Sequence, residues 1–487
     1  MLSILYILRE ESMRKPNVLL INCDDLGYGD LSCYGSSRND TPYLDRLAEE
    51  GVRFTDFYMG SSMCTPSRGC MMTGCYPPRI GFGEFHGEWV LFPGHDIGLN
   101  PSEISLAKMF KNAGYATMHI GKWHCGDQPG FLPTDHGFDD YYGLPYSNDM
   151  GRMPMRPDSP PLPLLHGREV IEQQPDQCTL TERYVEKSVE FIRDHRDEPF
   201  FLYLADMHVH LPLYVAPAFM EKSRNGAYGA CVSAIDWSTG ALIHALKRYG
   251  LYEDTIIIFT SDNGSRNDFG ESNGQLRGSK ATTFEGGFRV PLIVSWPGHT
   301  QAGVSHALMT SMDLYPTLAK IVGGTVPADR VIDGIEMTDQ FLGLDLNSKR
   351  DTFFYYQGNN LEAVRVRNWK LFVCRRPNAG KPSEADRPTD EDKKSPWSAI
   401  REAPIAELYD LDSDAGETTN VYDAHPEIVA ELMEKIVACR EDIGDAYTRT
   451  RGKNVRPIGH VDNARLLTEY DPDHPYIIAM YDRNESG

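Results

Sequence analysis

Pairs of side chains with hard oxygen atoms follow two apolar runs that lie far apart in the sequence. The run VLLIN leads to Asp24 and Asp25, and TIIIFT leads to Asp262 and Asn263. Taken singly, each pair is more often a cap for a neighbouring helix or turn. Together they suit Ca²⁺ or Mg²⁺ rather than zinc, because a hard cation prefers oxygen ligands and holds several carboxylates close without raising their pKa values.

Cationic and protonatable residues are also dense in the polar segments. A lone buried histidine is more often structural than catalytic, but Lys122 and His124 in GKWHCG directly follow an apolar run and are not both expected in a core. A cation-rich pocket beside a metal suits a doubly charged tetrahedral anion, either a sulfate or a phosphate ester. The candidates are Arg68, Lys122, His124, His210 and Lys280.

The stretch SSMCTPSRGCMMTGCYPPRIG holds three of the ten cysteines. No C-x-x-C pair and no regular spacing indicates a disulfide framework, so most cysteines are expected to be buried free thiols. A zinc site made by Cys64, Cys70 and Cys75 is an alternative. Its spacing matches no common zinc pattern, and His86 is a distant fourth ligand.

The elements that must position these groups alternate between β-rich and helical patterns from residue 16 to about 320, which predicts a layered α/β sheet. Four apolar strands each end in a polar cluster. Because ligands bind at the carboxyl ends of strands in open α/β sheets, the clusters should converge. Strands are predicted at 18–22, 115–120, 200–205, 255–260 and 288–296, and helices at 42–50 with Thr41 as N-cap, at 103–113, after a Thr179–Glu182 capping box, and at 228–247.

The end of the chain has a different pattern. The runs FFYYQ, AVRVRNWKLFVC and ELYDLD predict short antiparallel strands, and a closing helix is expected near 426–441. A polar segment at 375–396 is expected to be a surface loop. The predicted domains are 14–350, which is catalytic, and 351–487, a C-terminal subdomain.

Composition limits the function classes. The chain has 487 residues and a formal net charge of −22, without the Lys/Arg runs that phosphate neutralisation needs, so no nucleic-acid partner is expected. No apolar stretch reaches the roughly 20 residues that span a bilayer, so no membrane partner is expected. The short apolar run near the N-terminus has no basic region before it and no small-residue cleavage site, so it does not resemble a signal peptide. A cytoplasmic location is therefore predicted.

The Cys-Thr-Pro-Ser-Arg run resembles the Cys-x-Pro-Ser-Arg signature of the type I, formylglycine-dependent sulfatases. The similarity extends over nearly the whole chain and looks greatest to arylsulfatase-A-like carbohydrate sulfatases. Segments that carry it are NVLLINCDDLGYGD, GYATMHIGKWHCG, FLYLADMHVHLP, FTSDNG, SKATTFEGGFRVP and ELYDLDSDAGETTN. The resemblance implies an alkaline-phosphatase-like α/β sandwich with a large mixed sheet flanked by helices, plus a smaller C-terminal α+β subdomain with a short antiparallel sheet.

The resemblance also implies that Cys64 is oxidised to formylglycine by a formylglycine-generating or anaerobic sulfatase-maturating enzyme. Pro66, Ser67 and Arg68 would serve that recognition, and Arg68 would later stabilise the aldehyde hydrate. One hydroxyl of the hydrate would attack sulfur and the second would expel sulfate, a step that serine could not perform.

Further roles follow residue by residue from the resemblance. Lys122, Lys280 and Ser147 would bind the sulfate, and Asp262 would be the base. His124 would take a proton during sulfate release, and His210 would protonate the leaving alcohol. The metal, Ca²⁺ with Mg²⁺ as the alternative, would be held by Asp24, Asp25, Asp262, Asn263 and the residue formed from Cys64.

Two positions near these residues leave alternatives open. His208 competes with His210 for the role of acid, and His210 is favoured by its place before Leu211 and Pro212. Asn148 stands where close relatives often carry histidine, which affects one edge of the sulfate pocket.

The predicted function is hydrolysis of a sulfate monoester on a sulfated carbohydrate, such as an amino sugar or a glycosaminoglycan or mucin fragment. The alternatives are a phosphonate monoester or phosphodiester hydrolase of the same superfamily and a non-catalytic carbohydrate-binding relative. Loop residues are the candidates for substrate specificity. They are Glu84, His86, Trp89, Arg152, Gln357 and Asn359.

Overall fold

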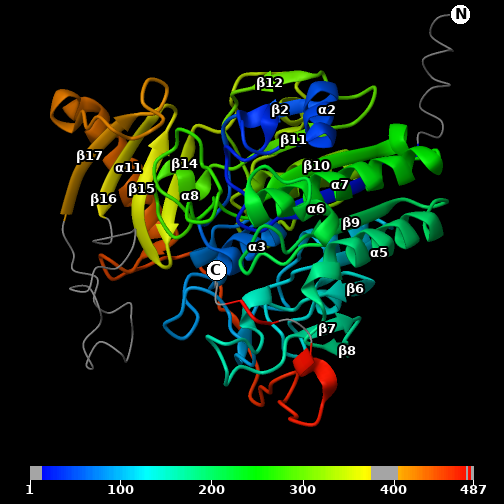
Figure 1. Ribbon diagram of the computed structural model, residues 1–487. Helices are drawn as coiled ribbons and strands as arrows, with labels where there is room; N and C mark the ends of the chain where they lie inside the picture. The colour runs from blue at the N-terminus through cyan, green and yellow to red at the C-terminus, as the bar shows by residue number, and fades with distance from the viewer. Residues whose placement is uncertain (1–13, 375–403, 479–480, 484–487) are drawn as a thin grey trace, which may run out of the picture.

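A large mixed β-sheet forms the centre of the molecule, and a smaller antiparallel sheet lies beside it (Figure 1). The computed structural model describes residues 14–374, 404–478 and 481–483. The large sheet has ten strands in the order β12-β2-β11-β10-β1-β9-β5-β6-β7-β8. Their bounds are β1 Asn17–Cys23, β2 Val52–Phe54, β5 Ala116–Gly121, β6 Asp140–Gly143, β7 Pro163–His166, β8 Glu169–Gln173, β9 Phe200–Ala205, β10 Thr255–Ser261, β11 Leu292–Ser295 and β12 Gly303–Ser305.

The centre of this sheet is parallel and buried on both faces. Strand β1 pairs with β10 on one side and β9 on the other, and β9 pairs with β5, all in parallel. Every residue of β1, β9 and β10 is buried, as expected for strands covered by helices on both faces. The carboxyl ends of β1, β5, β9 and β10 therefore meet at one edge.

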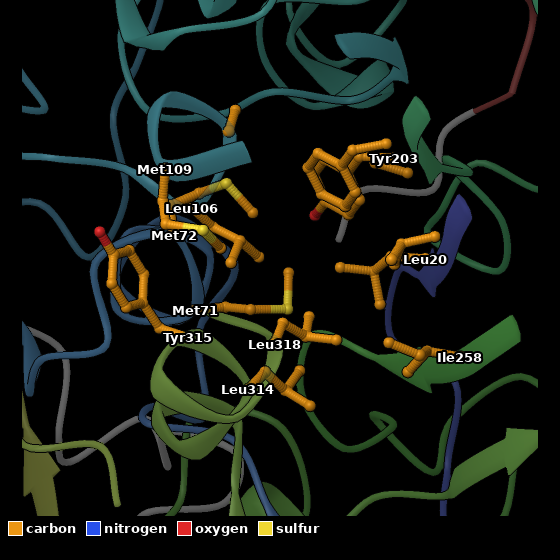
Figure 2. Close-up of a cluster of buried hydrophobic side chains, with 14 of the residues drawn as sticks. Leu20, Met71, Met72, Leu106, Met109, Tyr203, Ile258, Leu314, Tyr315 and Leu318 are labelled. Carbon is orange, nitrogen blue, oxygen red and sulfur yellow. The ribbon is translucent and has the colours of Figure 1, made fainter. Parts of the chain in front are cut away.

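Helices cover both faces of the sheet, so successive side chains of β1 point alternately into two different cores. Leu20 belongs to the core that includes α3 (Cys64–Thr73), α4 (Leu106–Asn112) and α9 (Leu314–Val322), part of which Figure 2 shows. Leu19 belongs to the opposite core, with α2 (Pro42–Glu50), α5 (Leu180–Asp194) and α7 (Gly226–Arg248). The sandwich predicted from the sequence is confirmed.

The antiparallel sheet of the C-terminal region has the order β14-β15-β16-β17, and α11 packs against it. These elements are β14 Thr352–Gln357, β15 Asn360–Val366, β16 Trp369–Cys374, β17 Pro404–Asp410 and α11 Pro426–Asp442. The sheet begins at Thr352, and the domain limits at 350 and 351 stay a prediction. The segment after α11 returns to the large sheet's side of the molecule, where β20 (Gly459–His460) pairs with β4 (Ile97–Gly98).

The remaining short elements join these layers. They are β3 Phe57–Tyr58, β13 Met309–Thr310, β18 Gly444–Asp445, β19 Thr450–Arg451, α6 Pro217–Met220, α8 Glu285–Phe288 and α10 Thr338–Phe341. No helix in the described ranges is long and apolar enough to cross a membrane.

Several predicted boundaries and caps differ from the structure. Helix α4 starts later than predicted because the Ser105 side chain accepts a hydrogen bond from the Lys108 amide. Phe288 ends helix α8 instead of starting a strand, and β11 begins only after Pro291, which has no amide proton to donate. The predicted loop at 375–396 lies outside the described residues.

The predicted capping box before α5 is wrong. Thr179 occupies the N-cap position, but its hydroxyl donates to the Asp176 carbonyl instead of accepting from the helix. The Asp176 carboxylate accepts from the Cys178 amide, so it caps the preceding turn. Thr41 likewise occupies the predicted N-cap position of α2 without forming a side-chain cap.

Candidate active site

The acidic cluster forms where β1 and β10 end side by side. Cys23 is in register with Ser261, so Asp24 and Asp262 leave the sheet together, and the Asp262 amide donates to the Cys23 carbonyl at 3.0 Å. One ligand atom from each of Asp24, Asp25, Asp262 and Cys64 lies within 4.8 Å of the others. All four residues are buried. The sheet thus brings together side chains that are more than 230 residues apart.

This donor set fits a divalent cation. Asn263 Nδ2 donates to Asp25 Oδ1 at 2.7 Å, and the buried Asn263 Oδ1 has no protein partner. Burial, followed by the charge of Asp24, raises the pKa of Asp262 to about 7. A divalent cation would relieve that repulsion and would accept the unpaired amide oxygen as a ligand.

Cys64 lies at the first position of α3, a helix whose ten residues are all buried. Its Sγ is 3.5 Å from Asp24 Oδ1. Burial raises the pKa of the Cys64 thiol well above its ordinary value, so the group is a neutral thiol and a poor nucleophile. This state agrees with a precursor that must be modified before it can react.

The zinc alternative is wrong for the residues that the structure describes. The groups able to hold a metal contain Cys64, but neither includes Cys70, Cys75 or His86. Cys70 Sγ lies 3.8 Å from Ser311 Oγ, and the exposed His86 pairs with Asp96.

Arg68, one turn after Cys64, connects the helix to the acidic cluster. Its Nε donates to Asp262 Oδ2 at 2.9 Å, and its Nη1 donates to the Lys122 carbonyl at 2.9 Å. Ser67 Oγ donates to the Asp262 carbonyl at 2.5 Å. The signature residues after Cys64 therefore hold the base candidate and the backbone of a lysine in place.

Two buried lysines lie on either side of the carboxylates. Lys122 Nζ is 2.5 Å from Asp24 Oδ2 and 2.9 Å from Ser147 Oγ, and Lys280 Nζ is 2.9 Å from Asp25 Oδ2. Burial opposes the charged form of Lys280, but Asp25 outweighs it and the pKa of Lys280 is raised. Both ammonium groups thus stay charged at neutral pH and can bind an anion. Lys122 and His124 are both buried, but among polar groups: Lys122 contacts Asp24, and burial, followed by the charges of Lys122 and Arg68, lowers the pKa of His124.

His210 presents one ring nitrogen to the site. Its Nδ1 lies 2.7 Å from the Leu211 carbonyl and 3.1 Å from Asn148 Oδ1, both acceptors, so Nδ1 carries a proton. Its Nε2 lies 3.3 Å from Ser147 Oγ and 3.9 Å from Asp25 Oδ2. Burial, followed by the charge of Lys280, lowers the pKa of His210.

His208 has a different environment. Its carbonyl accepts from the Asp24 amide at 2.9 Å, and its buried Nδ1 has no partner. Burial lowers the pKa of His208 to about 4, so the ring is neutral. His208 is absent from the metal-capable groups, whereas His210 joins Asp24 and Cys64 in one of them.

His124 is buried, and its Nε2 lies 3.0 Å from the Leu91 carbonyl. The Leu91 amide donates to Thr65 Oγ1, next to Cys64. The backbone of His124 is left-handed with φ 62°, as are those of Asp25 (φ 63°) and Ala281 (φ 66°). Three such non-glycine residues around one site agree with the concentration of backbone strain at functional sites.

Asn148 lies beside His210, and Gln177 bonds to Asn148, although the sequence did not identify either of them as functional. Asn148, noted only as a departure from relatives, contacts His210 through its Oδ1. Its Nδ2 donates to Gln177 Oε1 at 3.0 Å. Gln177 lies in a short turn before α5 and carries no motif, so no signal in the sequence identified it.

The predicted rim residues do not form one group. Gln357 is buried and accepts from Ser62 Oγ, two residues from Cys64, and Arg152 lies over the Tyr470 ring. Glu84 and His86 are exposed, while Trp89 and Asn359 are half-buried.

Comparisons with known proteins agree over nearly the whole chain. The family model named Sulfatase matches residues 16–324, and the C-terminal region of aryl-sulfatase matches 348–458. Arylsulfatase A of Homo sapiens is 38% identical over 450 residues, which cover 86% of this chain and 87% of that protein. N-acetylgalactosamine-6-sulfatase of Rattus norvegicus is 38% identical over 389 residues, covering 76% of this chain and 74% of that protein.

Solved structures give the same result. The PsFucS1 sulfatase from Pseudoalteromonas sp. superposes with a TM-score of 0.79 at 28% identity and covers 94% of this chain and 95% of that one. Ps i-CgsB in complex with k-i-k-neocarrahexaose has a TM-score of 0.72 at 29% identity, covering 87% and 92%.

Proposed function

Because the chain belongs to the sulfatase family, we propose that it hydrolyses the sulfate ester of a carbohydrate with a nucleophile made from Cys64. Hydrolysis of sulfate esters is the reaction of this family, and the chain is a sulfuric ester hydrolase. The observation that carries the proposal is the convergence of Asp24, Asp25, Asp262 and Cys64 within 4.8 Å.

Sulfatases generally use a formylglycine and a divalent cation, and this chain has residues for both. Asp24, Asp25, Asp262, Asn263 and the residue formed from Cys64 would hold the cation. An all-oxygen set of this size suits Ca²⁺, with Mg²⁺ as the alternative. When present, the two groups supply a hydroxyl nucleophile and a Lewis acid.

The chain's own residues then bind and orient the ester. Lys122, Lys280 and Ser147 bind the sulfate oxygens, and Asp262 takes the proton of the nucleophile. One charge 4 Å from the sulfate contributes about 4 kcal/mol at an effective dielectric constant near 20, against about 1 in water. Charges at this distance therefore act on the sulfate more strongly than the distant surface carboxylates, which water and salt screen.

His210 would protonate the leaving oxygen. Because Nδ1 is bonded to the Leu211 carbonyl, only Nε2 can exchange a proton with the substrate. His124, whose Nδ1 has no partner, accepts a proton when sulfate is released.

The substrate that we propose is a sulfated oligosaccharide, with a sulfated amino sugar as the first candidate. Support comes from the names of two relatives: one is an N-acetylgalactosamine-6-sulfatase, and one solved structure contains a neocarrahexaose. The phosphonate monoester hydrolase of Agrobacterium radiobacter shares the fold at 21% identity. A similarity this low is evidence for the fold alone and does not support phosphonate hydrolysis by this chain. A purely carbohydrate-binding role would not need the buried acidic and basic residues around Cys64.

A substrate screen tests this function. Released sulfate is measured with defined sulfated mono- and disaccharides and with 4-nitrophenyl sulfate, and an aryl phosphodiester is included. We expect sulfate release, a formylglycine mass in the Cys64 peptide, and no turnover by Cys64→Ala. Full activity of Cys64→Ala, or faster turnover of the phosphodiester, contradicts the proposal.

Metal removal tests the ligand assignment. Asp25→Ala should lose bound metal and activity together, because removing one carboxylate weakens the site that activates the nucleophile. Metal content is measured by mass spectrometry of the purified protein and activity with 4-nitrophenyl sulfate. Asp197→Ala, whose carboxylate is 91% exposed and lies outside the cluster, is the control. An unchanged rate after chelation would show that the assignment is wrong.

A further inference from the structure

A cavity of about 460 Å³ lies beside the active-site segments. One wall is Phe92 and Pro93, and the other is Met150 with residues 155–160. None of the residues that bind metal or sulfate in the proposed function lines it. Its volume is within the range of small-ligand sites in proteins.

Both walls continue from segments that contact His124 or His210. Phe92 follows Leu91, whose carbonyl contacts His124, and Phe92 also lines a small cavity that His124 and Tyr146 border. Met150 ends the turn Asn148–Met150, in which Asn148 contacts His210. A molecule in the cavity would therefore lie next to the segments that contact His124 and His210.

The lining suits a sugar ring. Phe92 is half-buried, and Met155 is 55% exposed, so both offer apolar surface. The guanidinium of Arg156 lies 5.8 Å from the centre of the Phe92 ring, and its Nη2 is 3.5 Å from Asp149 Oδ2. Because Asp149 already balances that cation and Asp158 adds a negative charge, the cavity favours an uncharged ring with hydroxyl groups over an anionic one.

The C-terminal segment 459–470 holds the two walls together, and it lies beyond residue 458, where the family matches end. On one side, Leu466 packs against Gly94. On the other, Thr468 Oγ1 donates to the Pro161 carbonyl at 2.5 Å, and the Tyr470 ring lies 3.6 Å from the Arg152 guanidinium. Figure 1 shows this segment in red near β7 and β8.

Its backbone is also fixed between these contacts. The Arg465 amide donates to Gln128 Oε1, and Gln128 Nε2 donates to the Arg465 carbonyl, both at 2.8 Å. Gln128 is buried and lies four residues after His124. The width of the cavity is thus set by a part of the chain that the family matches do not include.

We propose that this cavity binds an uncharged sugar ring of the substrate, next to the sulfated ring. The subsite rests on the proposed function, and it makes the substrate an oligosaccharide with an uncharged backbone sugar. Phe92 packs against the apolar face of the ring, and Arg156 and Ser159 bind its hydroxyl groups.

Binding to the full-length protein is the first test, because it does not depend on turnover. The probes for calorimetry are a desulfated carrageenan tetrasaccharide, which is uncharged, and a desulfated chondroitin tetrasaccharide, which carries uronates. We expect the first to bind more tightly, and Phe92→Ala and Ser159→Trp to weaken it by roughly 10-fold or more. Ser159→Trp fills the cavity from a half-buried loop position, so it serves if Phe92→Ala does not fold.

A matched control comes from another cavity of about 480 Å³, which Arg183 lines with Asp176 and Pro217. Arg183→Ala should leave binding unchanged, whereas Arg156→Ala should weaken it. No binding of the carrageenan probe, tighter binding of the chondroitin probe, or equal losses for Arg156→Ala and Arg183→Ala would overturn the subsite.

Kinetics separate this proposal from the proposed function. With a sulfated carrageenan tetrasaccharide, Phe92→Ala should raise KM by roughly 10-fold with little change in kcat, while kcat/KM for 4-nitrophenyl sulfate stays the same. An equal loss on both substrates overturns the subsite. If the wild type binds the tetrasaccharide but releases no sulfate from any ester, the proposed function fails and the subsite stands.

Discussion

Asp262 is held by hydrogen bonds from two elements, and its pKa is shifted by burial and by its charged neighbours. One of its oxygens accepts from Arg68 Nε and the other from the Asp25 amide. Its orientation is fixed from two elements, yet its pKa remains near neutrality because burial and Asp24 outweigh the arginine. A bound cation would favour the ionised carboxylate, which is the form that a general base requires.

The roles of the two histidines predict different dependence on the leaving group. His210→Ala should reduce turnover of a sugar sulfate by about 10²–10⁴-fold and that of 4-nitrophenyl sulfate much less, since nitrophenolate leaves without protonation. His124→Ala should affect both substrates similarly whenever sulfate release limits the rate. The measurement is kcat for both variants on both substrates.

The pH dependence follows from the same geometry. Because Nδ1 of His210 is already protonated, donation from Nε2 requires the charged ring, and burial lowers its pKa below the usual value near 6.5. For the sugar substrate, kcat/KM should therefore fall as the pH rises through a value below 6.5. Equal His210→Ala losses on both leaving groups would refute this role, and a selective loss in a folded His208→Ala variant would move it there.

Helix α3 illustrates what an element contributes. All of its residues are buried, including Cys64 and Arg68. Gly74 caps its C-terminal end with a φ of 69°, a left-handed conformation that glycine adopts readily because it has no side chain. Within it, a Cβ on Gly69 would lie 2.5 Å from the ring of Phe82. The close approach of helix and loop thus depends on one missing methyl group.

Gly69→Ala is expected to destabilise the protein. The helix preference of alanine contributes about 1 kcal/mol, but the buried Phe82 ring cannot leave, and overpacking costs about 1–3 kcal/mol. Gly240→Ala is the matched control: its Cβ meets the Tyr43 ring at the same 2.5 Å, but Tyr43 is 49% exposed and can turn away. Denaturant unfolding of both variants measures the difference. A more stable Gly69→Ala protein would contradict the packing argument.

What the sequence predicted at this scale depended on local patterns. Apolar runs located β1 and β10, and the polar pairs after them located Asp24 and Asp262, because parallel pairing brings strand ends together. The choice between His210 and His208 had little support in the sequence, since both lie in one short segment and the contacts of their ring nitrogens, which distinguish them, depend on the folded structure. Pairing of β20 with β4 joins residues more than 350 positions apart, and no periodicity reports such a contact.

Across the whole molecule, buried charges connect the C-terminal sheet to α8, the short helix that precedes β11 of the large sheet. Lys370 Nζ on β16 lies 3.0 Å from Glu285 of α8 and 2.8 Å from Glu417, and all three side chains are fully buried. The Glu285 amide also donates a hydrogen bond to Glu417 Oε2 at 2.8 Å. Removing a partner from such a group leaves an uncompensated buried charge, which is strongly destabilising.

The pH dependence of stability should report this connection. Burial, with repulsion from Glu285, raises the pKa of Glu417 to about 7. Because the pKa of Glu417 is higher in the folded protein than in the unfolded chain, protonation of this carboxyl stabilises the folded state. The contribution is complete below the pKa of the unfolded chain, near 4.3, and is lost as the pH rises through 7. Glu417→Gln should therefore flatten the decline of unfolding free energy between pH 4.3 and 7, an effect on the order of 1–3 kcal/mol.

The control for this measurement is Glu427→Gln, an exposed glutamate on α11. Urea unfolding across this pH range should give the wild-type slope for Glu427→Gln. A wild-type slope for Glu417→Gln as well would show that the buried carboxyl does not titrate in this window.

The order of strands in the large sheet also determines how much of the chain must be synthesised before the active-site pocket can form. Strand β1 lies between β9 and β10, so the pocket around Cys64 cannot close until the chain has been made as far as Asp262. That residue is 198 positions after Cys64, and at roughly 5–20 residues per second the ribosome needs about 10–40 seconds to reach it. Once folded, the cysteine is 1% exposed. The enzyme proposed to oxidise Cys64 would therefore meet an accessible thiol mainly during this interval, and we expect slower translation between these two positions to increase the fraction of mature protein.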